Sequence, residues 1–92
     1  PTIYTNLSNL SKIIIKDDFL KDHIKYIYSD SLSFYLSVNS FNYNIELGSL
    51  ENISEKLNNY KVFIASKIDD EILNKYSHLN LKFNKQVIAQ KK

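Results

Sequence analysis

The chain has 92 residues, of which 43% are hydrophobic and 24% are charged, and its formal net charge is +2. A chain of this length forms one small domain, and this composition excludes wholesale disorder and a collagen-like fibre. No apolar run approaches the ~20 residues of a membrane span, and no secretory signal pattern opens the chain. Because the first residue is Pro1 rather than methionine, we expect the chain to be part of a longer protein.

Several residue types that carry protein chemistry are missing or scarce. Cysteine is absent, which excludes disulfides, thiolate zinc sites and cysteine nucleophiles. All twelve basic residues are lysine, so bidentate recognition by guanidinium groups is excluded. The single glycine, Gly48, excludes glycine-rich phosphate loops and the nucleophile elbow, which need several glycines.

The first elements in chain order are predicted to be helical. Residues 6–16 form a helix, because apolar side chains recur at spacings of three and four. The pair Asp17-Asp18 favours a new helix N-terminus, with one further turn over residues 19–21. From residue 23 the apolar period changes to two, which predicts a strand over residues 24–29.

The next two segments, residues 31–38 and 41–47, alternate regularly between apolar and polar side chains. A two-residue turn at Asn39-Ser40 is expected to join them into an antiparallel hairpin with one apolar face. Leu32 and Phe41 are both expected on this apolar face.

The C-terminal half is predicted to form helices followed by two strands. Ser49 can cap a helix whose apolar stripe comprises Leu50, Ile53, Leu57, Tyr60 and Ile64. A second helix is expected over residues 69–76, because three acidic residues stand at its start. Strands are expected over residues 78–83 and 86–90, with a turn at Asn84-Lys85. This order of elements predicts an α+β fold, in which two to four helices lie on one face of a largely antiparallel sheet of about five strands.

Residues able to support catalysis or metal binding occur, but not in a pattern that requires either. His23 and His78 are the only histidines, lie far apart in the sequence and lack a metal-ligand partner at helical spacing. The acidic runs at 17–18 and 69–71 each stand where a helix should begin, so interaction with the helix dipole explains them. We therefore expect no enzyme activity, no metal and no cofactor.

The last predicted strand, residues 86–90, has little chain after it to cover its outer side. A strand at the edge of a sheet presents unpaired N–H and C=O groups. Either the flanking lysines, Lys85 and Lys91, protect this edge from pairing, or the edge accepts a strand from another chain by β-augmentation.

Several segments, in the order of the predicted elements, carry a resemblance to a known family. Residues 76–88 are similar to the C-terminal segment of the FtsQ/DivIB bacterial cell-division proteins, and most resemble its form in Bacteroidetes. Residues 43–57 resemble that family's I-x-L/F-G strand and the helix after it, and residues 16–27 resemble its D-x-F-W-x-x-Q-I segment. The Asp and Arg of the family's broader C-terminal motif are Asn80 and Lys82 here.

The resemblance implies a non-enzymatic scaffold on the outer face of the cytoplasmic membrane. Such domains hold the coiled-coil proteins FtsB and FtsL, help to recruit the septal cell-wall synthesis machinery, and accept a partner strand at their last edge. The family's transmembrane helix and POTRA domain are absent here, so we expect residues 1–92 to be a single domain that corresponds to the extracytoplasmic β-domain. The residues expected to contact the partner are Lys82, Phe83, Asn84, Lys85, Gln86, Val87, Ile88 and Ala89.

Two other functions remain open from the sequence. A nucleic-acid-binding module could use exposed tyrosines with Lys82, Lys85, Lys91 and Lys92, although the low net charge weighs against it. A structural fragment with no ligand of its own would have its last strand covered by other parts of its parent protein, and the isolated chain would then associate with itself.

Overall fold

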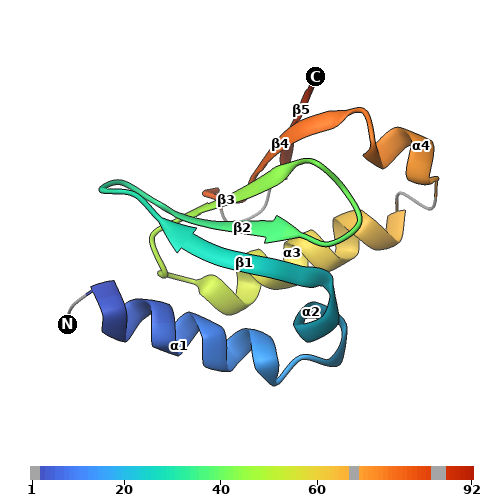
Figure 1. Cartoon of the computed structure of the whole chain (residues 1–92). Helices are drawn as coiled ribbons and strands as arrows, with labels where there is room; N and C mark the ends of the chain where they lie inside the picture. Colours follow the sequence, from blue (N-terminus) through green and yellow to red (C-terminus); the bar gives the residue numbers. More distant parts are fainter. Residues whose placement is uncertain (1–2, 67–68, 84–86) are drawn as a thin grey trace.

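The computed structural model describes residues 3–66, 69–83 and 87–92, which form four helices and one five-stranded sheet (Figure 1). The elements in chain order are α1 (Ile3–Ile15), α2 (Asp18–His23), β1 (Ile24–Ser29), β2 (Phe34–Val38), β3 (Asn44–Gly48), α3 (Ile53–Ser66), α4 (Asp70–Leu73), β4 (Tyr76–Asn80) and β5 (Ile88–Lys91). The predicted α+β fold with a largely antiparallel sheet is confirmed.

The strands lie in the order β1-β2-β3-β4-β5, so each strand pairs with its neighbour in sequence. All pairs are antiparallel except β3 and β4, which run parallel. Parallel neighbours need a crossover connection that returns the chain to the same end of the sheet, and α3 belongs to that connection. Figure 1 shows α3 crossing beneath the sheet, with α1 beneath the same face.

One row of side chains crosses all five strands on the face toward the helices, and we call it the inner row. Its members are Ile27, Leu36, Ile45, Leu79 and Ala89. The three central members are fully buried, and the helices complete the same core with Leu10, Ile14, Leu20, Leu57 and Tyr60. The apolar spacings that predicted the helices therefore do identify the residues that pack against the sheet.

Both acidic runs stand at helix starts, as predicted, and the first residue of each run caps its helix. The Asp17 carboxylate accepts hydrogen bonds from the N–H groups of Phe19 and Leu20, each at 3.0 Å, at the start of α2. The Asp69 carboxylate accepts one from the N–H of Glu71 at 2.9 Å, at the start of α4. These bonds satisfy backbone donors that have no partner within the helix.

The predicted strand over residues 31–38 begins later, at Phe34. The reason lies in Asp30, whose carboxylate accepts hydrogen bonds from the N–H groups of Leu32 and Ser33, both at 2.8 Å. This local turn competes with strand pairing and leaves Leu32 exposed at the tip of the hairpin rather than on the apolar face.

The prediction of a two-residue turn at Asn39-Ser40 is also wrong, because β3 begins only at Asn44. Asn39 is tied to the end of α2 instead: its N–H donates to the carbonyl of His23 at 3.0 Å, and its side-chain amide donates to the carbonyl of Asp22 at 2.8 Å. The connection therefore takes a longer path, and Phe41 lies within it, stacked on Tyr43.

Helix and strand boundaries in the C-terminal half also differ from the prediction. The helix expected from residue 50 begins at Ile53, because Asn52 has a positive φ of 57° that α-helical geometry excludes. The helix expected over 69–76 ends at Leu73, and the strand expected over 78–83 is β4, which begins at Tyr76. The strand expected over 86–90 is β5, which runs from Ile88 to Lys91.

A chain of polar side chains crosses the core. The Tyr60 hydroxyl lies 2.6 Å from that of Tyr43 and 2.5 Å from Nε2 of His23, which is half-buried at the end of α2. Burial raises the pKa of both tyrosines and lowers the pKa of His23. The neutral imidazole is thus the form that suits the folded chain.

This arrangement predicts a pH dependence of folding. Because the pKa of His23 lies below its ordinary 6.5 in the folded state, the unfolded chain binds more protons as the pH falls through that value. The contribution of neutral His23 to the free energy of unfolding is therefore expected to be retained above about pH 6.5 and to decrease below that pH. Urea denaturation at pH 7.5 and 5.5 measures this loss.

The control for this prediction is His23→Gln, which keeps an acceptor for Tyr60 but cannot titrate. We expect it to lose less stability between the two pH values than the wild type. The two proteins differ at residue 23 alone, so the comparison isolates its effect. Equal losses in the two proteins would show that His23 is not the source.

Candidate functional site

The sheet has two edge strands within the described residues, β1 and β5, and the β1 edge is the more protected. The pairing of β1 with β2 is interrupted between Ile24 and Tyr26, so Lys25 is a bulged residue. The ammonium of Lys25 lies 5.4 Å from the centre of the Tyr26 ring. A bulge and a lysine are both devices that prevent a further strand from pairing with an edge.

The β5 edge lacks such a bulge of its own. The one register shift between β4 and β5 falls in β4, between Tyr76 and His78, and β5 passes through consecutive partners from Ile88 to Lys91. Ile88 is 46% exposed on the outer face, whereas Ala89 belongs to the inner row and packs against the core. This strand therefore offers a regular run of backbone groups with one side chain toward solvent and the next toward the helices.

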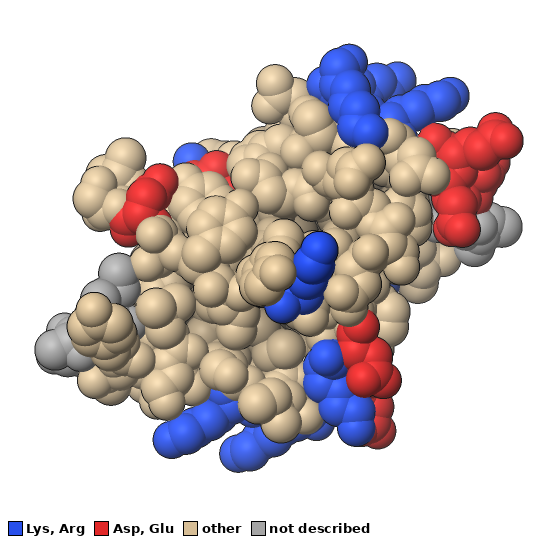
Figure 2. All heavy atoms as spheres, viewed as in Figure 1, with Lys and Arg blue, Asp and Glu red and all other residues tan. Residues whose placement is uncertain are grey.

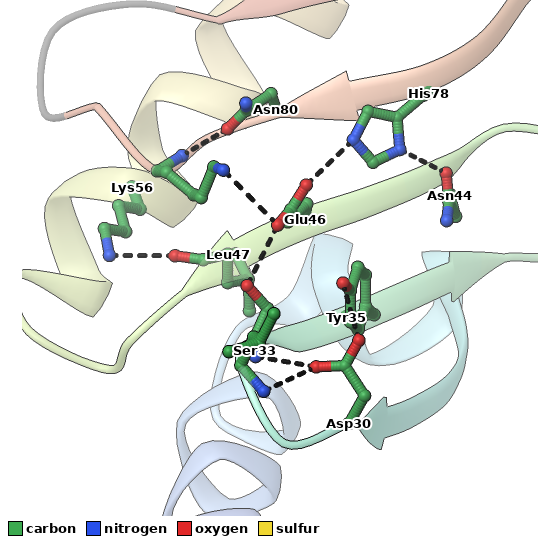
Figure 3. A network of polar contacts seen from close by, with 11 residues as sticks. Asp30, Ser33, Tyr35, Asn44, Glu46, Leu47, Lys56, His78 and Asn80 are labelled. Atoms are coloured by element: carbon green, nitrogen blue, oxygen red, sulfur yellow. Dashed lines mark hydrogen bonds and ion pairs between the residues drawn. The ribbon is translucent and has the colours of Figure 1, made fainter.

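The outer face of the sheet next to β5 carries a polar network centred on Glu46 (Figure 3). One carboxylate oxygen accepts a hydrogen bond from the Ser33 hydroxyl at 2.9 Å and lies 3.5 Å from the ammonium of Lys82. The other lies 3.1 Å from Nε2 of His78, whose Nδ1 is 2.6 Å from the side-chain oxygen of Asn44. Burial raises the pKa of Glu46, but the contacts with Ser33, His78 and Lys82 outweigh it, so the pKa lies below its usual value.

This network joins the parallel strands β3 and β4, which pair through only three residues of each strand. His78 on β4 contacts both Asn44 and Glu46 on β3. Because β5 pairs with β4, the network fixes the position of the edge strand relative to the rest of the sheet.

A buried lysine supports the end of β3 from the helix side. Lys56 on α3 is only 4% exposed, and its ammonium donates hydrogen bonds to the carbonyls of Leu47 and Ser49, both at 2.8 Å. Burial lowers the pKa of this ammonium, and the charge of Glu51 opposes that effect. The turn after β3 is thereby held against α3.

The described residues show neither a metal site nor a membrane-spanning helix. Over residues 3–66, 69–83 and 87–92, no three His, Asp or Glu side chains gather in a group that could hold a metal ion. No helix in the same part of the chain is long and apolar enough to cross a bilayer. The groups that the β5 edge exposes are strand backbone and the side chains around it.

Comparison with known proteins identifies the family. A family model described as FtsQ/DivIB, C-terminal related, matches residues 2–90. The chain belongs to this family. No curated protein and no solved structure matches it. Membership of the FtsQ/DivIB C-terminal related family indicates a role in cell division and confirms the resemblance that the sequence motifs suggested.

In this FtsQ/DivIB-related domain, the residues predicted to contact a partner fall into three groups. Ile88 and Ala89 are the first two residues of the edge strand β5, and Val87 stands immediately before it. Lys82 and Phe83 follow β4; Phe83 is 52% exposed, whereas Lys82 contacts Glu46. Residues 84–86 (Asn84, Lys85 and Gln86) lie outside the described residues.

Sequence reasoning missed the Glu46 network and the buried Lys56. Glu46 and His78 were assigned to the polar faces of their strands, but only the parallel pairing of β3 with β4 brings them together. Lys56 gave a signal that could have been used: it stands three residues after Ile53 and four before Tyr60, on the border of the apolar stripe of α3.

Substitution of Gly48 is expected to change the stability of the domain measurably. Its φ is +69°, and an added Cβ would lie 2.8 Å from Cγ of Lys82, which packs over it. Gly48→Ala is therefore expected to lower the free energy of unfolding by about 1–3 kcal/mol, because a non-glycine residue is strained at this φ. Urea denaturation measures the change.

The matched control is Asn52→Gly, at the other residue with positive φ. Glycine adopts this conformation without strain, so this variant is expected to stay within about 0.5 kcal/mol of wild type. If Gly48→Ala also stayed within that limit, neither the positive φ at Gly48 nor the close packing of Lys82 over it would matter for stability.

Proposed function

We propose that this domain is a non-enzymatic scaffold of the bacterial division machinery, which binds FtsB-like and FtsL-like chains by accepting a strand at the β5 edge. In β-augmentation, backbone hydrogen bonds supply affinity and alternate side chains supply specificity. The parent protein would hold the domain at the extracytoplasmic face of the cytoplasmic membrane, through a segment outside this chain.

One observation carries the proposal. In a domain of a cell-division family, the strand β5 pairs with β4 on one side, is regular along its length and has no described neighbour on the other side. Natural proteins normally bulge, charge or cover such an edge, as β1 illustrates with Lys25. In β5 the only charged residue is Lys91 at its end, and no bulge interrupts the strand, so a partner strand that covers this edge is the explanation that we favour.

The test is isothermal titration calorimetry of the folded domain with the extracytoplasmic regions of the FtsB-like and FtsL-like proteins encoded in the same genome. We expect saturable binding with one site per domain and little dependence on salt beyond that of an ordinary protein interface. A domain that is folded yet releases no heat with either region, alone or combined, would contradict the proposal.

Nucleic-acid binding is the weaker alternative. Lys82, one of the lysines that it requires, has its ammonium 3.5 Å from Glu46, so its charge is partly neutralised. A single-stranded oligonucleotide in the same calorimeter tests this role, because phosphate contacts make affinity fall steeply with salt. Binding of that kind in place of protein binding would favour the alternative.

A further inference from the structure

The outer face of the sheet, opposite the inner row, carries exposed tyrosines at its β1 end. We infer that this face binds an uncharged, extended polysaccharide chain, which lies across the strands from β1 to β4. This site goes beyond the proposed function, because it uses side chains on the flat of the sheet rather than the backbone of the β5 edge.

Strand pairing aligns the outer side chains in two rows that both start with a tyrosine on β1. The members of the first row are Tyr26, Ser37, Asn44 and His78. The members of the second row are Tyr28, Tyr35, Glu46 and Asn80. Neighbouring strands lie about 4.8 Å apart, so each row is about 14 Å long from β1 to β4. We call these two rows the outer rows, and their length suits a chain of several sugar rings better than a single sugar.

The tyrosines at the β1 end offer flat rings whose positions are already fixed in part. Tyr26 is 62% exposed and Tyr28 is 42% exposed. The Tyr28 ring stacks on Tyr35, with 5.2 Å between ring centres and 12° between ring planes, and the Tyr35 hydroxyl donates to the Asp30 carboxylate at 3.0 Å (Figure 3). The face of an aromatic ring is electron-rich, so the C–H groups of a sugar ring pack favourably against it.

Beyond the tyrosines, the outer rows present hydrogen-bonding groups with capacity to spare. The side-chain oxygen of Asn44 lies 2.6 Å from Nδ1 of His78. The amide N–H groups of Asn44 and the hydroxyls of Tyr26 and Tyr28 have no hydrogen-bond partner among residues 3–66, 69–83 and 87–92. Sugar hydroxyls both donate and accept hydrogen bonds, so amide and phenol groups of this kind suit them.

The charges on this face balance one another, which favours an uncharged ligand. Two carboxylates, of Glu46 and Asp30, and two ammonium groups, of Lys82 and Lys25, lie on or beside the outer rows. Lys82 is paired with Glu46, and β1 contributes Lys25 as its one cation. In Figure 2 the surface over β1, in the middle of the view, is largely uncharged. A chain of phosphates would need many cations here, whereas a neutral glycan complements the face as it stands.

The test is an NMR titration of the labelled domain with cellohexaose and with the hexamer of N-acetylglucosamine, two neutral glycans with extended β-linked chains. With at least one of them we expect saturable shift changes on the outer rows of β1, β2 and β3. Maltohexaose, whose α-linked chain coils, should give none. The affinity should stay the same when the salt concentration is raised, because no ion pair forms.

Tyrosine variants show whether the rings carry the binding. Tyr26→Ala and Tyr28→Ala should each lower the affinity about tenfold, since each removes a stacking surface. Tyr28→Phe keeps the ring and should lose less affinity than Tyr28→Ala. The control is Tyr4→Ala, at a tyrosine on α1 that is 80% exposed, and it should leave the affinity unchanged.

Three results would overturn the inference. One is a folded domain whose outer rows give no shift changes with either β-linked hexamer, and another is an equal loss of affinity in Tyr4→Ala and Tyr28→Ala. The third is that a single-stranded oligonucleotide or the FtsB-like region, rather than a glycan, shifts the signals of the outer rows, which would assign the face to another class of partner. None of these measurements depends on binding at β5, so the inference and the proposed function are tested separately.

Discussion

Proline at one of two adjacent positions in β5 is expected to weaken partner binding strongly while the domain stays folded. The variants are Ile88→Pro and Ala89→Pro. Successive N–H groups of a strand point to opposite edges, so one proline removes a donor directed at β4 and the other removes a donor directed at the partner. The outward one should lower affinity about 100-fold, because a lost hydrogen bond and an unpaired carbonyl on the partner together cost about 3 kcal/mol.

The inward proline should behave differently, since it breaks the pairing of β5 with β4 and lowers the melting temperature. Lys25→Pro, at the opposite edge of the sheet, is the control and should leave affinity unchanged. Calorimetric titration and thermal unfolding of the three variants separate these effects. Normal binding by both β5 variants, or loss of binding by Lys25→Pro, would show that β5 is not the docking edge.

The largest loss of stability is expected from Leu79→Ala. Leu79 is fully buried in the inner row between Ile45 on β3 and Ala89 on β5. Truncation removes buried methyl groups and leaves a cavity, which costs about 2–5 kcal/mol. A domain of this size has a free energy of unfolding of about 5–14 kcal/mol. The variant should therefore be measurably less stable, and a loss of about 5 kcal/mol would leave it partly unfolded at 37 °C if the wild type lies at the low end of that range.

Leu32→Ala makes the same chemical change at an exposed position, where Leu32 is 86% exposed. It should change the free energy of unfolding by less than about 0.5 kcal/mol. Urea denaturation of both variants gives the comparison. Similar losses at the two positions would mean that the inner row is not the centre of the core.

The sequence predicted the elements well where one periodic signal was present. The apolar stripe of α3 and the alternation along β2 and β3 each identified the buried residues, because a helix or strand with one buried face repeats with a fixed period. The helix starts at the two acidic runs were also predicted, since acidic residues favour the positive end of the helix dipole, and the structure adds that Asp17 and Asp69 cap these helices.

The boundaries that failed depend on hydrogen bonds that periodicity does not reveal. Asp30 accepts from the backbone of the next residues and delays β2, and Asn39 bonds to the end of α2 and prevents a tight hairpin. Asn52 adopts a left-handed conformation and delays α3. Each is a short polar side chain with more than one possible partner, and the tertiary structure decides between the partners.

The candidate site was predictable in part for the same reason. A terminal alternating segment predicted an edge strand, and β5 lies at the edge of the described sheet. The network around Glu46 could not be predicted, because it needs β3 and β4 to lie side by side. Residues far apart in sequence meet there without any local pattern.

The most direct measurement is an amide-resolved NMR titration of the labelled domain with the FtsB-like extracytoplasmic region. Docking at the edge predicts that the largest shift changes fall on β5, Ile88–Lys91, while β1 stays unchanged. Shift changes centred on β1 and its Lys25 bulge, or a folded domain whose spectrum does not change at saturating concentrations, would contradict a docking role for β5.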